Sequence, residues 1–372
     1  ESINLADTFA FTGTVSGTPT SPSFKNIIIN GDMQIAQRTT SSSSISSGAT
    51  YIVDRFFVSP SSAGTWTMSQ STTTPTGQGF GKSFKMDCTS ATGSLGASAN
   101  LIFQQRIEGQ NLQLLKKGTA NAESVTFSFW VRSNKTGTYT LEMYDNANAR
   151  QISQTYTISS ADTWEKKTVT FAGDTTGTLA NDNSSALTAL FWLGAGSNFT
   201  SGTLSTSWSS ATNANRVSSS QINLADSTSN EWYITGLQME VGTSASNFEF
   251  LPFDVNLARC QRYFVSYGLS LDDGTTVSHY SDTMFRAPLY GDNTISSGEC
   301  FALVKNPVEM RANPTFTAKY ALNGSASDQG NTNWGPFTGN SNRRNICLQK
   351  TTNSMSGNQS VILLAFTTDS EL

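Results

Sequence analysis

The sequence predicts an all-β chain in which two β-sandwiches are joined by a short helix. From Phe24 to about Pro252, runs of four to eight residues alternate apolar and polar side chains and are separated by Gly, Ser, Asn and Asp clusters. Helical periodicity is nearly absent outside one short stretch. At 372 residues, the chain is long enough for more than one domain.

The clearest strand begins at Val125, where the side chains separate onto two faces. Phe127 and Phe129 point to one side, and Trp130 and Arg132 point to the other. The apolar side is predicted to face a core, because alternation of this kind is typical of a half-buried strand. Trp130 and Arg132 are therefore expected on the non-core side.

Two further runs alternate in the same way. The run after residues 133–137 carries Glu142 and Tyr144 on its polar side, and the connection is short enough to predict a hairpin with the preceding strand. A third run places Trp192 opposite Phe191. If its strand lies in the same sheet, Trp192 joins the other polar-side residues in one polar-aromatic patch.

One helix is predicted over residues 255–264, with Asp254 as its N-terminal cap. About ten residues is too short for a helix to be stable alone, so it is expected to pack on other residues, including its own copies in a multimer. Residues 1–23 are interpreted as a connector, 24–253 as the first sandwich, 254–264 as the linking helix and 265–372 as the second sandwich. The strands expected in the second sandwich include 301–304, 316–322, 345–350 and 361–367.

Composition excludes several classes of protein. Charged residues are only 13% and the net charge is −4, which argues against a nucleic-acid binder. The apolar runs are too short to span a membrane. His279 is the only histidine and the four cysteines form no CxxC pair, so no cofactor is expected and the thiols are expected to be free. The pentapeptide Ile-Asn-Leu-Ala-Asp occurs twice, at 3–7 and 222–226.

Several stretches resemble a β domain of bacteriophage tail fibres and other virion appendage proteins. No single stretch is diagnostic, but they occur in the expected order and span most of the chain from Phe24 to Phe264, with two more near the end. They are NIIINGDMQIAQR at 26–38, DRFF at 54–57, QQRIE at 104–108, FSFWVRS at 127–133, TGLQMEVG at 235–242, LARCQRYF at 257–264, VEMRANPT at 308–315 and DSEL at 369–372.

The resemblance implies a jelly roll of the carbohydrate-binding-module type, followed by a smaller β-sandwich tip domain. It also implies a homotrimeric tail fibre of a virion, joined to upstream virion or tail components, whose distal domains touch the host envelope. Leu372 is then expected to be the natural C-terminus, and Glu1 to be part of a longer polypeptide. Similar jelly rolls often hold a structural calcium between their first and last strands, where Asp32 and Glu240 lie here.

Sugar sites pair an aromatic platform with side chains that hydrogen-bond hydroxyl groups. The polar-side residues fit this chemistry, and tryptophans in loops are further contact candidates. The alternative is that Trp130 and Trp192 are covered by a loop or by a partner subunit. The ligand-binding candidates are Trp130, Arg132, Glu142, Tyr144, Trp192, Trp208 and Trp334.

Three functions remain open at this point. The chain is interpreted as a non-enzymatic receptor-binding protein that attaches the virion to host-surface polysaccharide, either lipopolysaccharide or capsule. The alternative is a purely structural fibre or capsid decoration protein, because low charge and a hydroxyl-rich surface also suit subunit packing. The third function is a depolymerase, which needs two carboxylates flanking the scissile bond. Glu142, beside Trp130, is the one candidate acid, and no second carboxylate is evident to pair with it.

Overall fold

The computed structural model describes residues 24–268, 285–288, 300–323, 334–336, 342–350 and 360–372. Within these residues the chain forms β-sheets of antiparallel strands with two short α-helices, so the expectation of an all-β fold is confirmed. The interpreted connector 1–23 and His279 lie outside the described residues.

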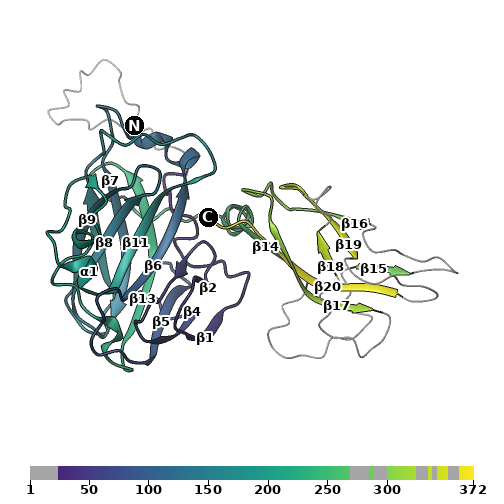
Figure 1. Cartoon of the computed structure of the whole chain (residues 1–372), viewed down its shortest axis with the longest axis horizontal. Helices are drawn as coiled ribbons and strands as arrows, with labels where there is room; N and C mark the ends of the chain where they lie inside the picture. The colour runs from purple at the N-terminus through teal and green to yellow at the C-terminus, as the bar shows by residue number, and fades with distance from the viewer. Residues whose placement is uncertain (1–23, 269–284, 289–299, 324–333, 337–341, 351–359) are drawn as a thin grey trace, which may run out of the picture.

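The first β region is a sandwich of two sheets, of which one has six strands in the order β1-β4-β5-β13-β7-β10 (Figure 1). The pairing of β13 with both β5 and β7 brings the end of this region between two much earlier strands. The strands are β1 (Ser41–Ile45), β4 (Thr65–Ser71), β5 (Ser83–Ser90), β13 (Glu231–Val241), β7 (Val125–Ser133) and β10 (Glu165–Phe171).

The other sheet has seven strands in the order β12-β9-β8-β11-β6-β3-β2. Its strands are β12 (Ser209–Ser210), β9 (Arg150–Ile158), β8 (Gly137–Asp145), β11 (Ser185–Ala195), β6 (Asn100–Glu108), β3 (Phe57–Val58) and β2 (Thr50–Tyr51). Short helical turns lie in the connections, namely η1 (Gly109–Asn111), η2 (Gln113–Leu115), α1 (Ser197–Thr200), η3 (Asn213–Asn215) and η4 (Leu224–Asp226).

The core lies between these two sheets and is rich in aromatic rings. Phe103 of β6 packs 4.9 Å from Phe84 of β5, 5.4 Å from Trp232 of β13 and 6.0 Å from Phe191 of β11, measured between ring centroids. All four side chains are buried. Each such side chain contributes roughly 1.5–3 kcal/mol to folding through burial, so the aromatic contacts tie the two sheets together.

The hairpin predicted between the strands around Val131 and Leu141 is wrong. β7 pairs with β13 and β10 in the six-stranded sheet, whereas β8 pairs with β9 and β11 in the seven-stranded sheet. The connection at 134–136 therefore crosses from one sheet to the other instead of turning back in the same sheet. Alternation fixes which face of a strand is buried, but it does not say which strand is the neighbour.

The linking helix α2 spans Phe253–Gln261 and packs on residues 26–35 of the same chain. Its N-cap is Pro252, and Asp254 lies inside the first turn without a capping hydrogen bond, so the predicted cap at Asp254 is wrong. The acidic side chain still faces the positive end of the helix dipole. Cys260 and nearby Tyr263 are buried in a small cluster, which also includes Ile29, Ile35, Leu257 and Leu372.

The second β region is built around β20 (Ser360–Asp369), which returns to the junction with the first region (Figure 1). The strands predicted at 301–304, 316–322, 345–350 and 361–367 are all confirmed within a residue or two. The pairing partners of β20 are β14 (Phe264–Gly268), β15 (Phe285–Pro288) and β17 (Thr315–Asn323). A second sheet orders β16 (Cys300–Lys305), β19 (Asn345–Lys350) and β18 (Trp334–Pro336).

Arginine side chains connect the two regions. Arg55 is buried, forms an ion pair with Glu371, and places its guanidinium 3.4 Å from the centre of the Tyr263 ring. It also donates a 2.7 Å hydrogen bond to the Arg106 carbonyl, and Arg106 in turn donates to the Leu372 carbonyl. These contacts fix Glu371 and Leu372, which follow β20, on the first region.

Two more arginines complete this junction. Arg262, just after α2, binds both carboxylate oxygens of Glu108 at 3.0 and 2.8 Å. Arg311 donates to the carbonyls of Asn183, Ser370 and Glu371. Residues from six of the resembling stretches meet here, namely 26–38, 54–57, 104–108, 257–264, 308–315 and 369–372.

Candidate functional site

The outer side of the six-stranded sheet carries two of the sequence-predicted site residues. Along β7, Phe129 is buried in the core, whereas Trp130 and Arg132 are half-buried on the opposite side. The strand register places Trp130 beside Lys166 of β10 and Arg132 beside Tyr233 of β13. The surface formed by Trp130, Arg132, Trp164, Lys166 and Tyr233 is called the Trp130 face below.

Tyr233 lies at the centre of this face. The Trp164 ring packs 6.1 Å away in an edge-on arrangement, and the Arg132 guanidinium lies 5.0 Å from the centre of the tyrosine ring. The phenol donates a 2.7 Å hydrogen bond to Glu231, which also accepts a 2.6 Å bond from Lys85. Burial, together with the bond to Glu231, raises the pKa of the Tyr233 phenol.

Trp164 and Tyr233 are not among the ligand-binding candidates predicted from the sequence. A signal for Tyr233 was present, because it stands between the core residues Trp232 and Ile234 and must point outward from the strand. The indole N–H of Trp164 is buried and has no hydrogen-bond acceptor in the described part of the chain. A buried donor without an acceptor is uncommon, and an added hydroxyl or water would satisfy it.

This combination suits recognition of a sugar. The half-buried rings of Trp130 and Trp164 supply apolar surface for C–H groups, and Arg132 and Lys166 supply hydrogen-bond donors at the edge. The Tyr233 side chain is itself buried and supports Trp164 and Arg132 from within the face. Arg132 is already oriented by a 2.9 Å ion pair with Asp162, and 21% of its side chain is exposed. Its remaining donors are therefore held in a fixed position instead of being freely mobile.

The outer side of the seven-stranded sheet is different, and the expected single patch is not formed. Glu142 and Trp192 lie on this second sheet, on the other side of the sandwich from Trp130, and both are fully buried. The indole N–H of Trp192 donates a 2.8 Å hydrogen bond to Glu142, which also accepts from Arg216 at 2.8 Å. Tyr144 is half-buried with the Arg216 guanidinium 4.9 Å from its ring centre.

The segment 196–223 covers this second face. Val217 is buried against Trp192, and Phe199 packs 5.2 Å from the tryptophan ring. Gln221 donates a 2.9 Å hydrogen bond to the Trp192 carbonyl, which fixes the end of the segment. The alternative considered for Trp192, burial under a loop, is therefore correct.

Glu142 cannot serve as an exposed acid. Burial raises the pKa of its carboxyl, and the Arg216 guanidinium and the Trp192 N–H act in the opposite direction. Its side chain is fully buried, so no substrate bond can reach it in this arrangement. The one acid that the sequence suggested for glycoside cleavage is thus part of an internal ion pair.

The two loop tryptophans differ in what surrounds them. Trp208 is half-buried at the edge of the core, where its indole N–H donates to the Ala172 carbonyl at 2.8 Å and the Lys117 ammonium lies 4.8 Å from its ring centre. That ammonium group also forms ion pairs with Asp145 and Asp174. Trp334 begins β18, but its side chain lies outside the described part of the structure.

The two calcium candidates have separate protein partners. Asp32 accepts a 3.0 Å hydrogen bond from Asn256 of α2. Glu240 accepts from the Ser246 backbone and hydroxyl and from the Gln238 side-chain amide. Burial raises the pKa of Asp32. Among the described residues there is no group of three or more metal-ligating side chains, and a calcium site at Asp32 and Glu240 stays a prediction.

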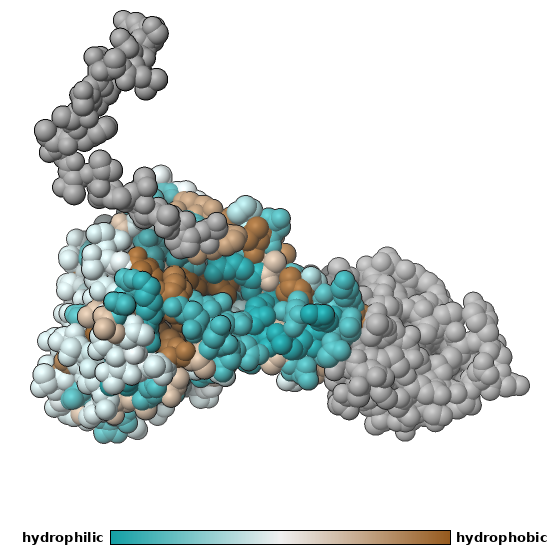
Figure 2. All heavy atoms as spheres, turned by 90° about the horizontal axis from the view of Figure 1, so that it is seen from above, coloured by the Kyte–Doolittle hydropathy of each residue, from teal (hydrophilic) through white to brown (hydrophobic). Residues whose placement is uncertain are grey.

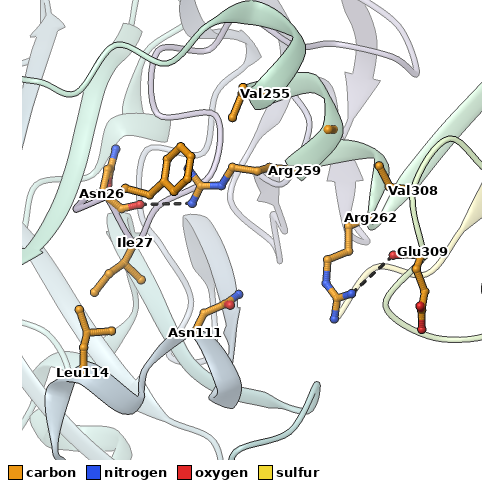
Figure 3. Close-up of a pocket in the computed structure, with 11 residues that line it drawn as sticks. Asn26, Ile27, Asn111, Leu114, Val255, Arg259, Arg262, Val308 and Glu309 are labelled. Carbon is orange, nitrogen blue, oxygen red and sulfur yellow. Dashed lines mark hydrogen bonds between the residues drawn. The ribbon is translucent and has the colours of Figure 1, made fainter. Parts of the chain in front are cut away.

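A groove of about 600 Å³ lies beside α2. Its apolar lining includes Ile27, Leu114, Val255 and Val308, which come from four different segments, as Figure 3 shows. Figure 2 shows hydrophobic patches among hydrophilic residues on the face of the first region that it draws.

Neither α-helix of the described structure has the length and hydropathy of a membrane span.

No protein-family model matches the chain, and no curated protein matches it. Among solved structures, the chain is similar to the enzymatically active domain of bacteriophage CBA120 tailspike protein 4, with 13% identity and a TM-score of 0.31. The match covers 59% of this chain but only 22% of the tailspike chain.

Two further similar structures are a putative sugar binding protein from Bacteroides thetaiotaomicron VPI-5482 and the carbohydrate-binding module TmCBM61 in complex with β-1,4-galactotriose. The first has 10% identity, covers 58% of this chain and 99% of its own, and has a TM-score of 0.33. The second has 10% identity, covers 58% and 98%, and has a TM-score of 0.29. TM-scores this low leave the fold to be defined by the sheet order of the chain itself.

Proposed function

We propose that this chain is a receptor-binding segment of a virion tail fibre, which attaches the particle to host cell-surface glycan. The observation that carries the proposal is the Trp130 face, where the half-buried rings of Trp130 and Trp164 and the cationic side chains of Arg132 and Lys166 lie on the outer side of one sheet, with the buried Tyr233 ring in contact with Trp164 and Arg132. The opposite sheet surface has lost this property, because the segment 196–223 covers it. Lipopolysaccharide and capsule are the two glycan classes proposed.

The role is non-catalytic. Binding needs only aromatic surface and fixed hydrogen-bond donors, both of which the Trp130 face supplies. Glycoside hydrolysis needs a pair of carboxyl groups placed on either side of the bond. The acids beside this face, Glu231 and Asp162, already form ion pairs with Lys85 and Arg132.

The test is a glycan array and a host-cell binding assay on the full chain, on Trp130→Ala and on Tyr144→Ala. Tyr144 is the matched control, because it is also a half-buried aromatic but belongs to the covered face. Saturable binding that is lost in Trp130→Ala and kept in Tyr144→Ala is expected, with both variants folded by circular dichroism. Binding that survives Trp130→Ala would remove the Trp130 face from the proposal.

A homotrimer in the virion is part of the same proposal. Sedimentation equilibrium of the full chain is expected to give three times the chain mass. A monomeric chain that still binds glycan would keep the adhesin role and overturn the trimer.

A second candidate function is a purely structural fibre or capsid decoration protein. The junction favours this second function, because residues from six of the resembling stretches meet there and fix the two regions together. Three residues of the Trp130 face, in contrast, lie outside the resembling stretches, namely Trp164, Lys166 and Tyr233. An intact oligomer that binds neither any glycan nor any host cell would support this second function.

A further inference from the structure

The groove beside α2 lacks an occupant among the described residues. Two large apolar side chains at its rim are exposed, Phe24 at 55% and Leu114 at 36%. The groove floor includes Ile27 and Val308, so the apolar surface continues from rim to floor. Among the described residues only four large apolar side chains are exposed, and two of them lie at this groove. A continuous apolar surface of this kind is typical of a binding site for another segment.

Arg259 of α2 adds a charge to this groove. It donates a 3.2 Å hydrogen bond to the Asn26 carbonyl, which Figure 3 shows, and forms no ion pair with a carboxylate in the described ranges. Burial lowers the pKa of its guanidinium, in contrast to Arg262, whose pKa is raised because of its bonds to Glu108 in spite of burial. The groove therefore combines apolar walls with the partly buried Arg259, which forms no ion pair within the described residues. Glu249 lies near enough to act against the lowering of its pKa, and Glu309 also lines the groove.

The chain enters the described structure at this groove, because Phe24 is both the first described residue and part of the lining. The 23 residues before it contain Glu1 and Asp7 and no Lys or Arg, and their large apolar residues are concentrated in residues 3–11. The twelve residues between Phe11 and Phe24 include two glycines and two prolines, which favour turns. Thirteen peptide steps also span up to about 45 Å, which is ample for a return to a groove at Phe24.

The repeated pentapeptide shows how this segment can bind. In its second copy, Asn223 accepts a 2.9 Å hydrogen bond from the Ala225 N–H and caps the turn η4. Leu224 is fully buried in the core, and Asp226 forms an ion pair with Lys135. Residues 3–7 have the same five side chains, among them a leucine that suits an apolar pocket and an aspartate that suits a cation.

We propose that residues 3–11 of the same chain fill the groove, with Leu5 in its apolar part and Asp7 paired with Arg259. The apolar residues that come after the pentapeptide, Phe9 and Phe11, cover Leu114 and Phe24 at the rim. The segment preceding the first sandwich is thereby a docked element that contacts α2 and the start of the second region at Val308.

Hydrogen exchange measured by mass spectrometry on the full chain tests the docking. The amides of residues 3–11 are expected to exchange at least about tenfold more slowly in the native chain than in Leu5→Asp. Val15→Asp is the matched control, because it changes an apolar residue of the same segment outside the docked part. Equal exchange in the native chain and in Leu5→Asp, or loss of protection in Val15→Asp alone, would overturn the proposal.

The charge pair gives an independent test. Asp7→Arg and Arg259→Asp are each expected to remove most of the protection, and the double variant Asp7→Arg/Arg259→Asp is expected to restore it. Arg259→Lys, which keeps the charge, is expected to retain protection and guards against a folding defect at α2. Failure of the double variant to recover, with a native circular dichroism spectrum, would remove Asp7 and Arg259 as partners.

A disulfide distinguishes the same chain from a second copy. In Leu5→Cys/Ala258→Cys, oxidation is expected to form a disulfide within one chain, which is detected by mass spectrometry as a linked pair of peptides after digestion without reductant, while the band on a denaturing gel stays at the mass of one chain. Ala258 lines the groove, so the new thiols are expected to meet there. A band at twice the chain mass would assign the groove to the segment of a neighbouring copy and overturn the assignment to the same chain.

Discussion

The two outer faces of the first sandwich carry the same kind of residue and have opposite exposure. Trp130 and Trp192 both point away from the core between the two sheets. Trp192 has the Arg216 guanidinium 5.2 Å from its ring centre and donates a hydrogen bond to Glu142, whereas Trp130 shares its face with Arg132. Trp192 is fully buried because the segment 196–223 packs over it, whereas Trp130 is half-buried on a face with aromatic neighbours. The presence or absence of a covering segment, and not the strand itself, decides whether an outward tryptophan is fully buried or stays partly exposed.

The largest difference is expected from removing the covered ring. Trp192→Ala should lower the free energy of unfolding by about 3–5 kcal/mol, because it leaves a cavity between the sheet and Val217 and frees Glu142 of a hydrogen bond. Urea denaturation followed by fluorescence and circular dichroism measures this. A loss below about 1 kcal/mol would mean that the covering segment is not packed as described.

The ion pair beneath the segment is expected to matter almost as much. Arg216→Ala should cost about 3 kcal/mol at pH 7, because it leaves Glu142 charged and buried. Burial raises the pKa of Glu142, so the folded state binds a proton at this carboxyl more readily than the unfolded state does. Without Arg216 this effect is larger, so the loss of stability in Arg216→Ala should shrink as the pH is lowered toward 5. Adding Glu142→Gln to Arg216→Ala should recover part of the stability. A cost that is independent of pH would contradict this account.

A smaller loss of stability is expected in acid at Asp174, which forms an ion pair with the Lys117 ammonium group beside the Trp208 ring. Burial raises the pKa of Asp174, but bonds from Arg150 and Lys117 outweigh it and lower the pKa to about 2. Because the folded-state pKa is depressed, the associated stability is present above the usual value near 3.8 and is lost as the pH falls toward 2.

Thermal unfolding between pH 5 and pH 2 measures this effect. The melting temperature of the native chain should fall more steeply below pH 4 than that of Asp174→Asn. Parallel curves for the two proteins would show that Asp174 does not carry the acid sensitivity.

The smallest effect on stability is expected on the open face. Trp130→Ala should change the free energy of unfolding by about 1 kcal/mol or less, because the ring is half-buried and makes no hydrogen bond to the described residues. The same denaturation experiment used for Trp192→Ala measures it. A loss as large as that of Trp192→Ala would show that Trp130 supports the fold, which would weaken its assignment to ligand binding.

The sequence predicted the strands well and their neighbours poorly. Alternation located the strand at Val125 and the next one around Leu141, and it separated core from outer residues correctly in both. It could not show that they belong to different sheets, because alternation is a property of one strand and pairing is a property of two. The expected patch combined Trp130 with Glu142 for this reason.

Burial of Trp192 was equally hard to foresee. The covering segment is rich in Ser, Asn and Thr, and its contacts depend on isolated residues such as Phe199 and Val217 and on the single charge of Arg216. No periodic pattern in the sequence predicts contacts of this kind. The outward direction of Tyr233, in contrast, is fixed by its position between two core residues and is readable from the sequence.

The return of β20 to the junction has a mechanical consequence. β14 leaves the junction and β20 comes back to it as paired antiparallel neighbours, and Arg55 and Arg311 hold the end of β20 on the first region. A force that pulls the second region away from the first is shared by two strands. The second region is therefore held at two places in the chain, and its attachment does not depend on the short connecting helix alone.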